Sequence, residues 1–181
     1  MKIVPNIISI FRICLVPVFV AVYFADARDI RVYAIMIYAL AAISDFFDGF
    51  LARKYQVSSN LGKLLDPLGD KLMTFAVILC MTIAGPIPIW AVVIIGLKEV
   101  LMAIGGYVVH KVAHVELPPA KFIGKVSTVV FFLVCVSVMI FAIPGNIVIL
   151  MISGAILLML LAFASYIQTY VVVMKNREKS R

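Results

Sequence analysis

Six long apolar runs fill nearly all of this 181-residue chain, and they constrain its fold more than any other feature. The hydrocarbon core of a bilayer is about 30 Å thick, and about 20 apolar residues cross it as an α-helix. Hydrophobic residues make up 65% of the sequence and charged residues only 14%, too apolar a balance for a soluble domain. The runs cover residues 3–24, 31–52, 62–84, 87–110, 121–143 and 146–174.

We therefore predict an all-α integral membrane protein with six transmembrane helices. Only helices and closed barrels satisfy the backbone in lipid, and these uniform runs lack the alternation of barrel strands. Residues 1–174 are expected to form one membrane domain, and residues 175–181 a basic, frayed tail. Short turns at Gly85-Pro86 and Pro144-Gly145 are expected to join antiparallel helices. The first run is interpreted as retained, because Arg12 interrupts it and no convincing cleavage site follows.

The basic residues predict the orientation of the chain in the membrane. The net charge of +7 comes from short clusters at the ends of apolar runs, such as Arg53-Lys54 and the segment from Lys175 to Arg181. With six spans threaded, these clusters fall on one side, which the positive-inside rule makes the cytoplasm. Both termini are therefore predicted to be cytoplasmic. No continuous basic face exists, so nucleic acid is not an expected partner.

The three cysteines carry little functional information. Cys14, Cys80 and Cys135 lie in three different apolar runs, without the C-x-x-C spacing of a zinc or redox site. We therefore predict buried thiols, with no disulfide framework and no zinc site.

Four aspartates lie within apolar runs, where burying a charge in the membrane is energetically unfavourable. Asp45 and Asp48 lie near the end of the second run, and Asp66 and Asp70 near the start of the third. These spacings put each pair on one face of its helix, and the hairpin between the runs brings the pairs together near the cytoplasmic surface. Helix capping or pairing with nearby lysines and arginines would not require four converging carboxylates. Ionisable groups in a membrane segment are functional by default.

Such a cluster requires cations, because neighbouring carboxylates otherwise raise one another's pKa sharply. Ligands that offer only oxygen favour magnesium, manganese or calcium over zinc. Two ions held there could clamp both the attacking and the leaving oxygen of a phosphoryl displacement. Nearby residues suit a phosphate: Gly49 and Gly62 allow close approach to the backbone, Ala52 is small, and Arg53 offers a forked cation.

The residues between and around the aspartates resemble a known family. The pattern begins with Asp45-x-x-Asp48-Gly49-x-x-Ala52-Arg53 and continues, after eight residues, with Gly62, then Asp66 and Asp70, each after three further residues. This pattern is similar to the signature of the CDP-alcohol phosphotransferases, which are integral membrane enzymes of phospholipid synthesis. Its eight fixed positions all match. The opening Val4-Pro5-Asn6-Ile7-Ile8-Ser9-x-x-Arg12 and the segment Gly124-Lys125-x-x-Thr128 resemble the branch of the family that makes acidic phospholipids.

The resemblance implies a role for each matched residue. Asp45, Asp48, Asp66 and Asp70 would bind two divalent ions, Mg²⁺ or Mn²⁺, and Asp70 would also take the proton of the acceptor hydroxyl. That hydroxyl would attack the lipid-side phosphorus of CDP-diacylglycerol, and CMP would leave. The residues implied to bind CDP are Asn6, Asp48, Gly49, Ala52, Arg53 and Gly62.

The acceptor alcohol is less constrained than the donor. Glycerol 3-phosphate is the acceptor that the resemblance favours, and its phosphate needs cations, for which Arg12, Lys98, Lys121 and Lys125 are the candidates. The alternative interpretation of these side chains is that they snorkel to the interface and report only topology. Lys98-Glu99 is a candidate structural ion pair, although neighbours on a helix are expected to point to different faces and not to pair directly.

Three positions depart from the branch that uses glycerol 3-phosphate. That branch has Arg-Glu where this chain has Lys98-Glu99, a second arginine at Gly106, and a basic residue at Ser127. Fewer cations would suit a less phosphate-rich pocket, as in the related cardiolipin synthases, in which phosphatidylglycerol is the acceptor. Inositol phosphate and serine are further alternative acceptors within the family.

Two other functional classes fit the four aspartates less well. A cation-coupled transporter would place its carboxylates near the bilayer midplane, and a structural scaffold would leave four aspartates unexplained. We expect a multi-pass protein of the bacterial inner membrane, in contact with membrane lipid. A homodimer is also expected, and Gly105-Gly106 would permit close helix packing, including between subunits.

Overall fold

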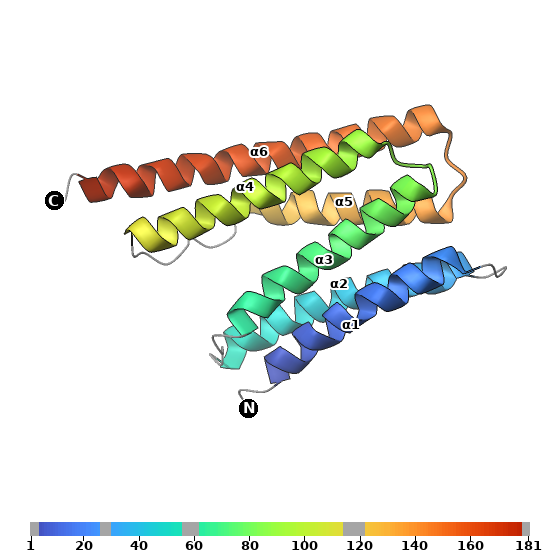
Figure 1. Cartoon of the computed structure of the whole chain (residues 1–181), viewed down its shortest axis with the longest axis horizontal. Helices are drawn as coiled ribbons and strands as arrows, with labels where there is room; N and C mark the ends of the chain where they lie inside the picture. The colour runs from blue at the N-terminus through green and yellow to red at the C-terminus, as the bar shows by residue number, and fades with distance from the viewer. Residues whose placement is uncertain (1–3, 26–29, 56–61, 114–121, 179–181) are drawn as a thin grey trace. The chain divides into compact units, whose positions relative to one another are not determined.

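The computed structural model describes the backbone of residues 4–25, 30–55, 62–113 and 122–178, and the side chains of residues 10–25, 31–44, 69, 71–108 and 122–172. Within these residues the regular structure is entirely α-helical (Figure 1). The six helices are α1 (Val4–Phe24), α2 (Ile30–Tyr55), α3 (Gly62–Ile83), α4 (Ile89–Ala113), α5 (Phe122–Ile140) and α6 (Gly145–Glu178). The all-helical fold class and the six segments predicted from the sequence are confirmed.

The helix bounds agree with the predicted runs to within a few residues, with one informative difference. The sequence predicts a basic, frayed tail from residue 175, whereas α6 continues to Glu178. Lys, Arg and Glu are good helix formers, and cations near the carboxyl end of a helix interact favourably with its dipole. The start of the predicted tail is therefore helical.

Within the described residues, three helices are long and apolar enough to cross a membrane. They are Ile89–Val108, Phe122–Ile140 and Gly145–Val172. Three shorter apolar helical stretches lie in the first half of the chain, at Ile10–Phe24, Arg31–Ser44 and Lys71–Ile83. The molecule thus has the character of a membrane protein. The cytoplasmic position of the termini stays a prediction.

The chain divides into two compact units. The first contains Met1–Gly85 with Met139–Ala142, and the second contains Pro86–Val138 with Ile143–Arg181. In the first unit, α1 packs against both α2 and α3, and α2 contacts α3 (Figure 1). Phe19 of α1 is fully buried, and its ring lies 6.3 Å from that of Tyr38 in α2, measured between centroids.

The second unit is built on α6. One stripe of this helix is buried, at spacings of three and four residues that repeat along its length. The stripe comprises Val148, Ile152, Ala155, Met159 and Ala162. Helix α4 packs along α6, and at Gly105 the ring of Tyr170 lies 3.4 Å from where a β-carbon would be. The predicted close packing at Gly105 is therefore found within the chain, and the homodimer stays a prediction.

The connections that follow α3 and α5 are short, as the sequence predicts. Gly85 follows α3 with φ of 98°, a backbone conformation that glycine adopts without the strain that a β-carbon brings. Its amide donates to the carbonyl of Thr82 at 3.1 Å, which closes the helix end. After α5, the carbonyl of Pro144 accepts hydrogen bonds from the amides of Ile147 and Val148 and so supports the first turn of α6.

Candidate functional site

The predicted metal ligands lie on two helices of the first unit. Asp45 and Asp48 belong to the last three turns of α2, and Asp66 and Asp70 to the first turns of α3. At a rise of about 1.5 Å per residue, Asp45 and Asp48 are about 10–15 Å from the end of α2, and Asp66 and Asp70 about 6–12 Å from the start of α3. Only residues 56–61 separate the two helices, and the helices contact one another.

The helix assignments therefore agree with two carboxylate pairs on neighbouring helices, at similar distances from their connection. The side chains of these four aspartates lie outside the described residues, so their convergence stays a prediction. Gly69, between Asp66 and Asp70, is buried, so α3 is closely packed at this level. Among the side chains that the structure does describe, no three His, Cys, Asp or Glu residues lie together as a metal site would require.

The chemistry of the donor set fits divalent metal ions. Four carboxylates offer only hard oxygen ligands, and magnesium and manganese prefer such ligands. The residues predicted to bind CDP lie on these two helices and on α1: Asn6 on α1, Asp48, Gly49, Ala52 and Arg53 on α2, and Gly62 as the first residue of α3. Their side chains also lie outside the described residues.

Arg12 is the one charged side chain buried in the described part of the first unit. It is 1% exposed, and it shares one face of α1 with the buried Leu15 and Phe19 at spacings of three and seven residues. This is the face that packs against α2 and α3. The interpretation of Arg12 as a snorkelling topology signal is wrong, because a snorkelling side chain keeps its charged end in water. A buried guanidinium instead requires anionic or carbonyl partners.

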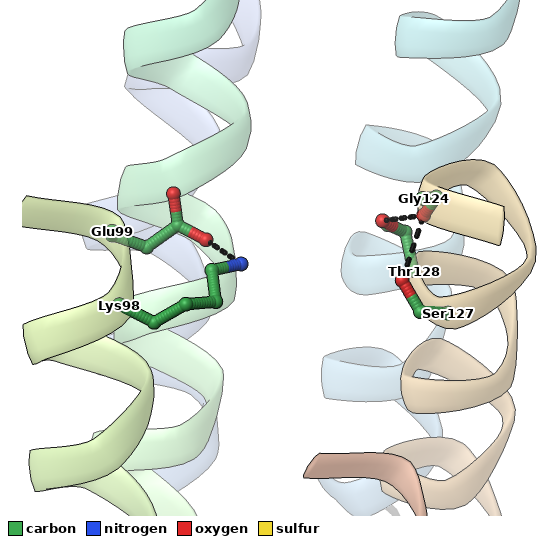
Figure 2. A network of polar contacts seen from close by, with 5 residues as sticks. All are labelled: Lys98, Glu99, Gly124, Ser127 and Thr128. Carbon is green, nitrogen blue, oxygen red and sulfur yellow. Dashed lines mark hydrogen bonds and ion pairs between the residues drawn. The ribbon is translucent and has the colours of Figure 1, made fainter. Parts of the chain in front are cut away.

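Lys98 and Glu99 form an ion pair within α4 (Figure 2). The prediction that these neighbours would not pair directly is wrong. The long, flexible stem of lysine lets its ammonium swing round the helix to the next residue's carboxylate. The side chains are 14% and 29% exposed, so a low-dielectric surrounding strengthens the attraction. Lys98, predicted as an acceptor ligand, thus already has its charge balanced within the chain.

The start of α5 is a small polar cluster. Ser127 is 3% exposed, and its hydroxyl donates to the carbonyl of Gly124 at 2.8 Å. The hydroxyl of Thr128 donates to the same carbonyl at 3.1 Å (Figure 2). Lys125 lies between Gly124 and Ser127 in sequence and is exposed, so its ammonium is accessible. Lys121, the other predicted acceptor ligand of this segment, lies outside the described residues.

Sequence reasoning missed the side chain that packs on this cluster. A β-carbon built on Gly124 would lie 3.1 Å from the hydroxyl oxygen of Tyr166 in α6 and 3.3 Å from its Cε2 atom. The sequence does hold a signal for this contact: Tyr166 and Tyr170 are four residues apart and so share one face of a helix, and the two preceding helices contain Gly105 and Gly124, where a ring can approach closely.

The three cysteines are free. Cys80 and Cys135 are buried, as predicted, but the prediction is wrong for Cys14, which is exposed on α1. Its neighbours Leu15 and Arg12 occupy the buried face of the helix, and Cys14 lies on another face.

The sequence of this chain matches a protein family and several named proteins. The family model described as CDP-alcohol phosphatidyltransferase matches residues 2–174. A protein of Mycobacterium tuberculosis, named as a probable phosphatidylglycerophosphate synthase, is 32% identical over 144 residues, which are 77% of this chain and 65% of the relative.

Two further relatives are named CDP-diacylglycerol–glycerol-3-phosphate 3-phosphatidyltransferase. The Rickettsia bellii protein is 39% identical over 77 residues, which are 42% of each chain. The Salmonella typhimurium protein is 35% identical over 79 residues, which are 44% of this chain and 43% of the relative. The chain thus spans less than two thirds of the length of each of these relatives.

Proposed function

Because the chain belongs to the CDP-alcohol phosphatidyltransferase family, we propose that it transfers the phosphatidyl group of CDP-diacylglycerol to glycerol 3-phosphate. The products are phosphatidylglycerophosphate and CMP. The observation that carries the proposal is the complete eight-position signature from Asp45 to Asp70, inside a family match over residues 2–174. The names of the relatives in Rickettsia, Salmonella and Mycobacterium support glycerol 3-phosphate as the acceptor.

The proposed mechanism assigns the donor half of the reaction to α2 and α3. Asp45, Asp48, Asp66 and Asp70 would hold Mg²⁺ or Mn²⁺, which neutralises charge on the pyrophosphate when bound. Asp70 accepts the proton of the acceptor hydroxyl, whose oxygen forms a bond to the lipid-side phosphorus. The phosphorus–oxygen bond to CMP breaks, and CMP leaves. Arg53 supplies a cation for a phosphate oxygen.

The acceptor phosphate requires cations of its own. Arg12 and Lys125 are the candidates that the described structure favours, Arg12 because it is a buried charge beside α2 and α3, and Lys125 because it is exposed on a well-anchored turn. Lys121 remains a candidate from the sequence. Lys98 is a weaker candidate, because its ammonium is paired with Glu99.

The same pairing supports a second candidate acceptor. Among the described residues, Lys98 is balanced by Glu99, and the uncharged Ser127 stands where the branch that uses glycerol 3-phosphate has a basic residue. The described part of the chain therefore offers fewer cations to a phosphorylated acceptor than that branch does. Phosphatidylglycerol, the acceptor in the cardiolipin synthase reaction, is therefore the second candidate. We further propose that the chain lies in the bacterial inner membrane with both termini and the active site on the cytoplasmic side.

The experiment that tests this function supplies purified protein with CDP-diacylglycerol and magnesium, together with one alcohol at a time. The alcohols are glycerol 3-phosphate, phosphatidylglycerol, inositol phosphate and serine, and CMP release is measured. Fastest release with glycerol 3-phosphate is expected. Fastest release with phosphatidylglycerol would select the second candidate, and no release with any alcohol would refute an enzyme of this class.

A further inference from the structure

Tyr166 of α6 lies against Gly124 at the start of α5, directly before Lys125. Because Gly124 has no side chain, the tyrosine ring comes close to the α5 backbone. A β-carbon on Gly124 would be 3.1 Å from the Tyr166 hydroxyl oxygen, 3.3 Å from Cε2 and 3.6 Å from Cζ. The first two distances are shorter than ordinary van der Waals contact, so no larger residue fits without movement. Gly124 and Tyr166 therefore form a specific contact between α5 and α6.

The same glycine is held from its carbonyl side as well. Its carbonyl accepts hydrogen bonds from the hydroxyls of Ser127 and Thr128 at 2.8 and 3.1 Å (Figure 2). Ser127 is buried, so water does not compete for its bond. The Gly124 backbone is thus fixed both by the ring of Tyr166 and by two hydroxyls.

A second tyrosine extends the contact to α4. Tyr170 follows Tyr166 by one helical turn, and the two ring centroids are 6.5 Å apart. The ring of Tyr170 lies 3.4 Å from where a β-carbon on Gly105 would be. The two tyrosines therefore align α6 with two neighbouring helices, each at a glycine.

Lys125 is the functional residue that this contact supports. Its side chain is exposed, while the residue before it, Gly124, is in close contact with Tyr166. A binding group must be held to within about 0.5 Å of its productive place, and residues beneath it supply that precision. The stem of lysine has only four carbons, so the position of its backbone limits which anions its ammonium can reach.

We infer that Tyr166 is a positioning residue for the acceptor: its ring, seated at Gly124, fixes the turn from which Lys125 reaches the acceptor phosphate. The inference rests on the proposed function and adds to it a residue outside the family signature. The ring carries the effect, because two of the three atoms nearest the Gly124 position are ring carbons. Tyr166→Phe should therefore retain positioning, and Tyr166→Leu should lose it.

The first test measures KM for glycerol 3-phosphate and for CDP-diacylglycerol separately. Gly124→Ala and Tyr166→Leu should each raise the KM for glycerol 3-phosphate about fivefold or more, with the KM for CDP-diacylglycerol changed by less than about twofold. Tyr166→Phe should leave both values within about twofold of the parent. The matched control is Gly154→Ala, since a β-carbon at this exposed position in α6 would meet nothing within 4 Å. Unchanged KM values in Gly124→Ala, or equal changes for both substrates, would overturn the inference.

The second test does not depend on turnover. Hydrogen exchange of the purified protein in detergent should become faster at residues 122–130 in Tyr166→Leu, and stay at the parent rate in Gly154→Ala. Equal exchange in the parent and in Tyr166→Leu would refute the anchoring. If the parent releases no CMP but the exchange changes as expected, the proposed function fails while the anchoring of α5 stands.

Discussion

Replacing Arg12 with methionine tests whether its buried charge serves the acceptor. The side chain is 1% exposed, and it lies on the face of α1 that packs against α2 and α3. Methionine keeps a similar length and fills the same space, so the change removes charge and hydrogen bonds without a large cavity. A hydrogen bond to a charged group contributes about 1.5–3 kcal/mol, which corresponds to about a 10- to 150-fold change in an equilibrium constant.

Arg12→Met is therefore expected to raise the KM for glycerol 3-phosphate by at least about tenfold, with a much smaller rise for CDP-diacylglycerol. The assay is CMP release with one substrate varied and the other saturating. Arg31→Met is the matched control, because Arg31 is an exposed arginine on α2 and should leave both KM values unchanged. Equal increases for both substrates would refute a role at the acceptor and leave Arg12 a structural charge.

Three further predictions concern the core, one turn and the metal. Phe19→Ala should lower the free energy of unfolding, measured by thermal unfolding in detergent, by about 3 kcal/mol, because Phe19 is fully buried. Phe11 lies on the same helix but is 44% exposed, so Phe11→Ala should change the free energy of unfolding little. Gly85→Ala should cost about 1–2 kcal/mol in the same assay because of its φ of 98°, and an unchanged midpoint would contradict that strain. Removing divalent ions with a chelator should abolish CMP release, and added Mg²⁺ or Mn²⁺ should restore it, whereas full activity in the chelator would rule out the metal site.

The sequence predicted the helices well because length and apolarity decide them. Six runs separated by Gly, Pro and charged residues predicted six helices, and the observed bounds differ by only a few residues. The end of α6 was missed because the charged residues after Val172 are good helix formers, although they are unsuited to lipid. The change from apolar to charged residues indicates where a helix leaves the lipid, but the helix can continue beyond that point.

The candidate site was predicted unevenly. Fixed spacings identified the four aspartates, because a metal site requires particular ligands at particular helical positions. Sequence did not reveal whether Arg12 points into the core, since all the residues that follow it in α1 are apolar and do not distinguish the buried side from the lipid side. Nor did it reveal the pairing of Lys98 with Glu99, which depends on side-chain rotamers, or the contact of Gly124 with Tyr166, which joins residues 42 positions apart.

The most direct test of the central claim follows labelled glycerol 3-phosphate into lipid. Purified protein with CDP-diacylglycerol and Mg²⁺ should convert it to phosphatidylglycerophosphate, identified by mass, with one CMP released for each lipid formed. Asp70→Asn should form neither product while retaining the parent's helical content, because the amide cannot accept the hydroxyl proton. Labelled lipid formed by Asp70→Asn at the parent's rate would contradict the role of this aspartate. No labelled lipid from the parent would contradict transfer to glycerol 3-phosphate itself.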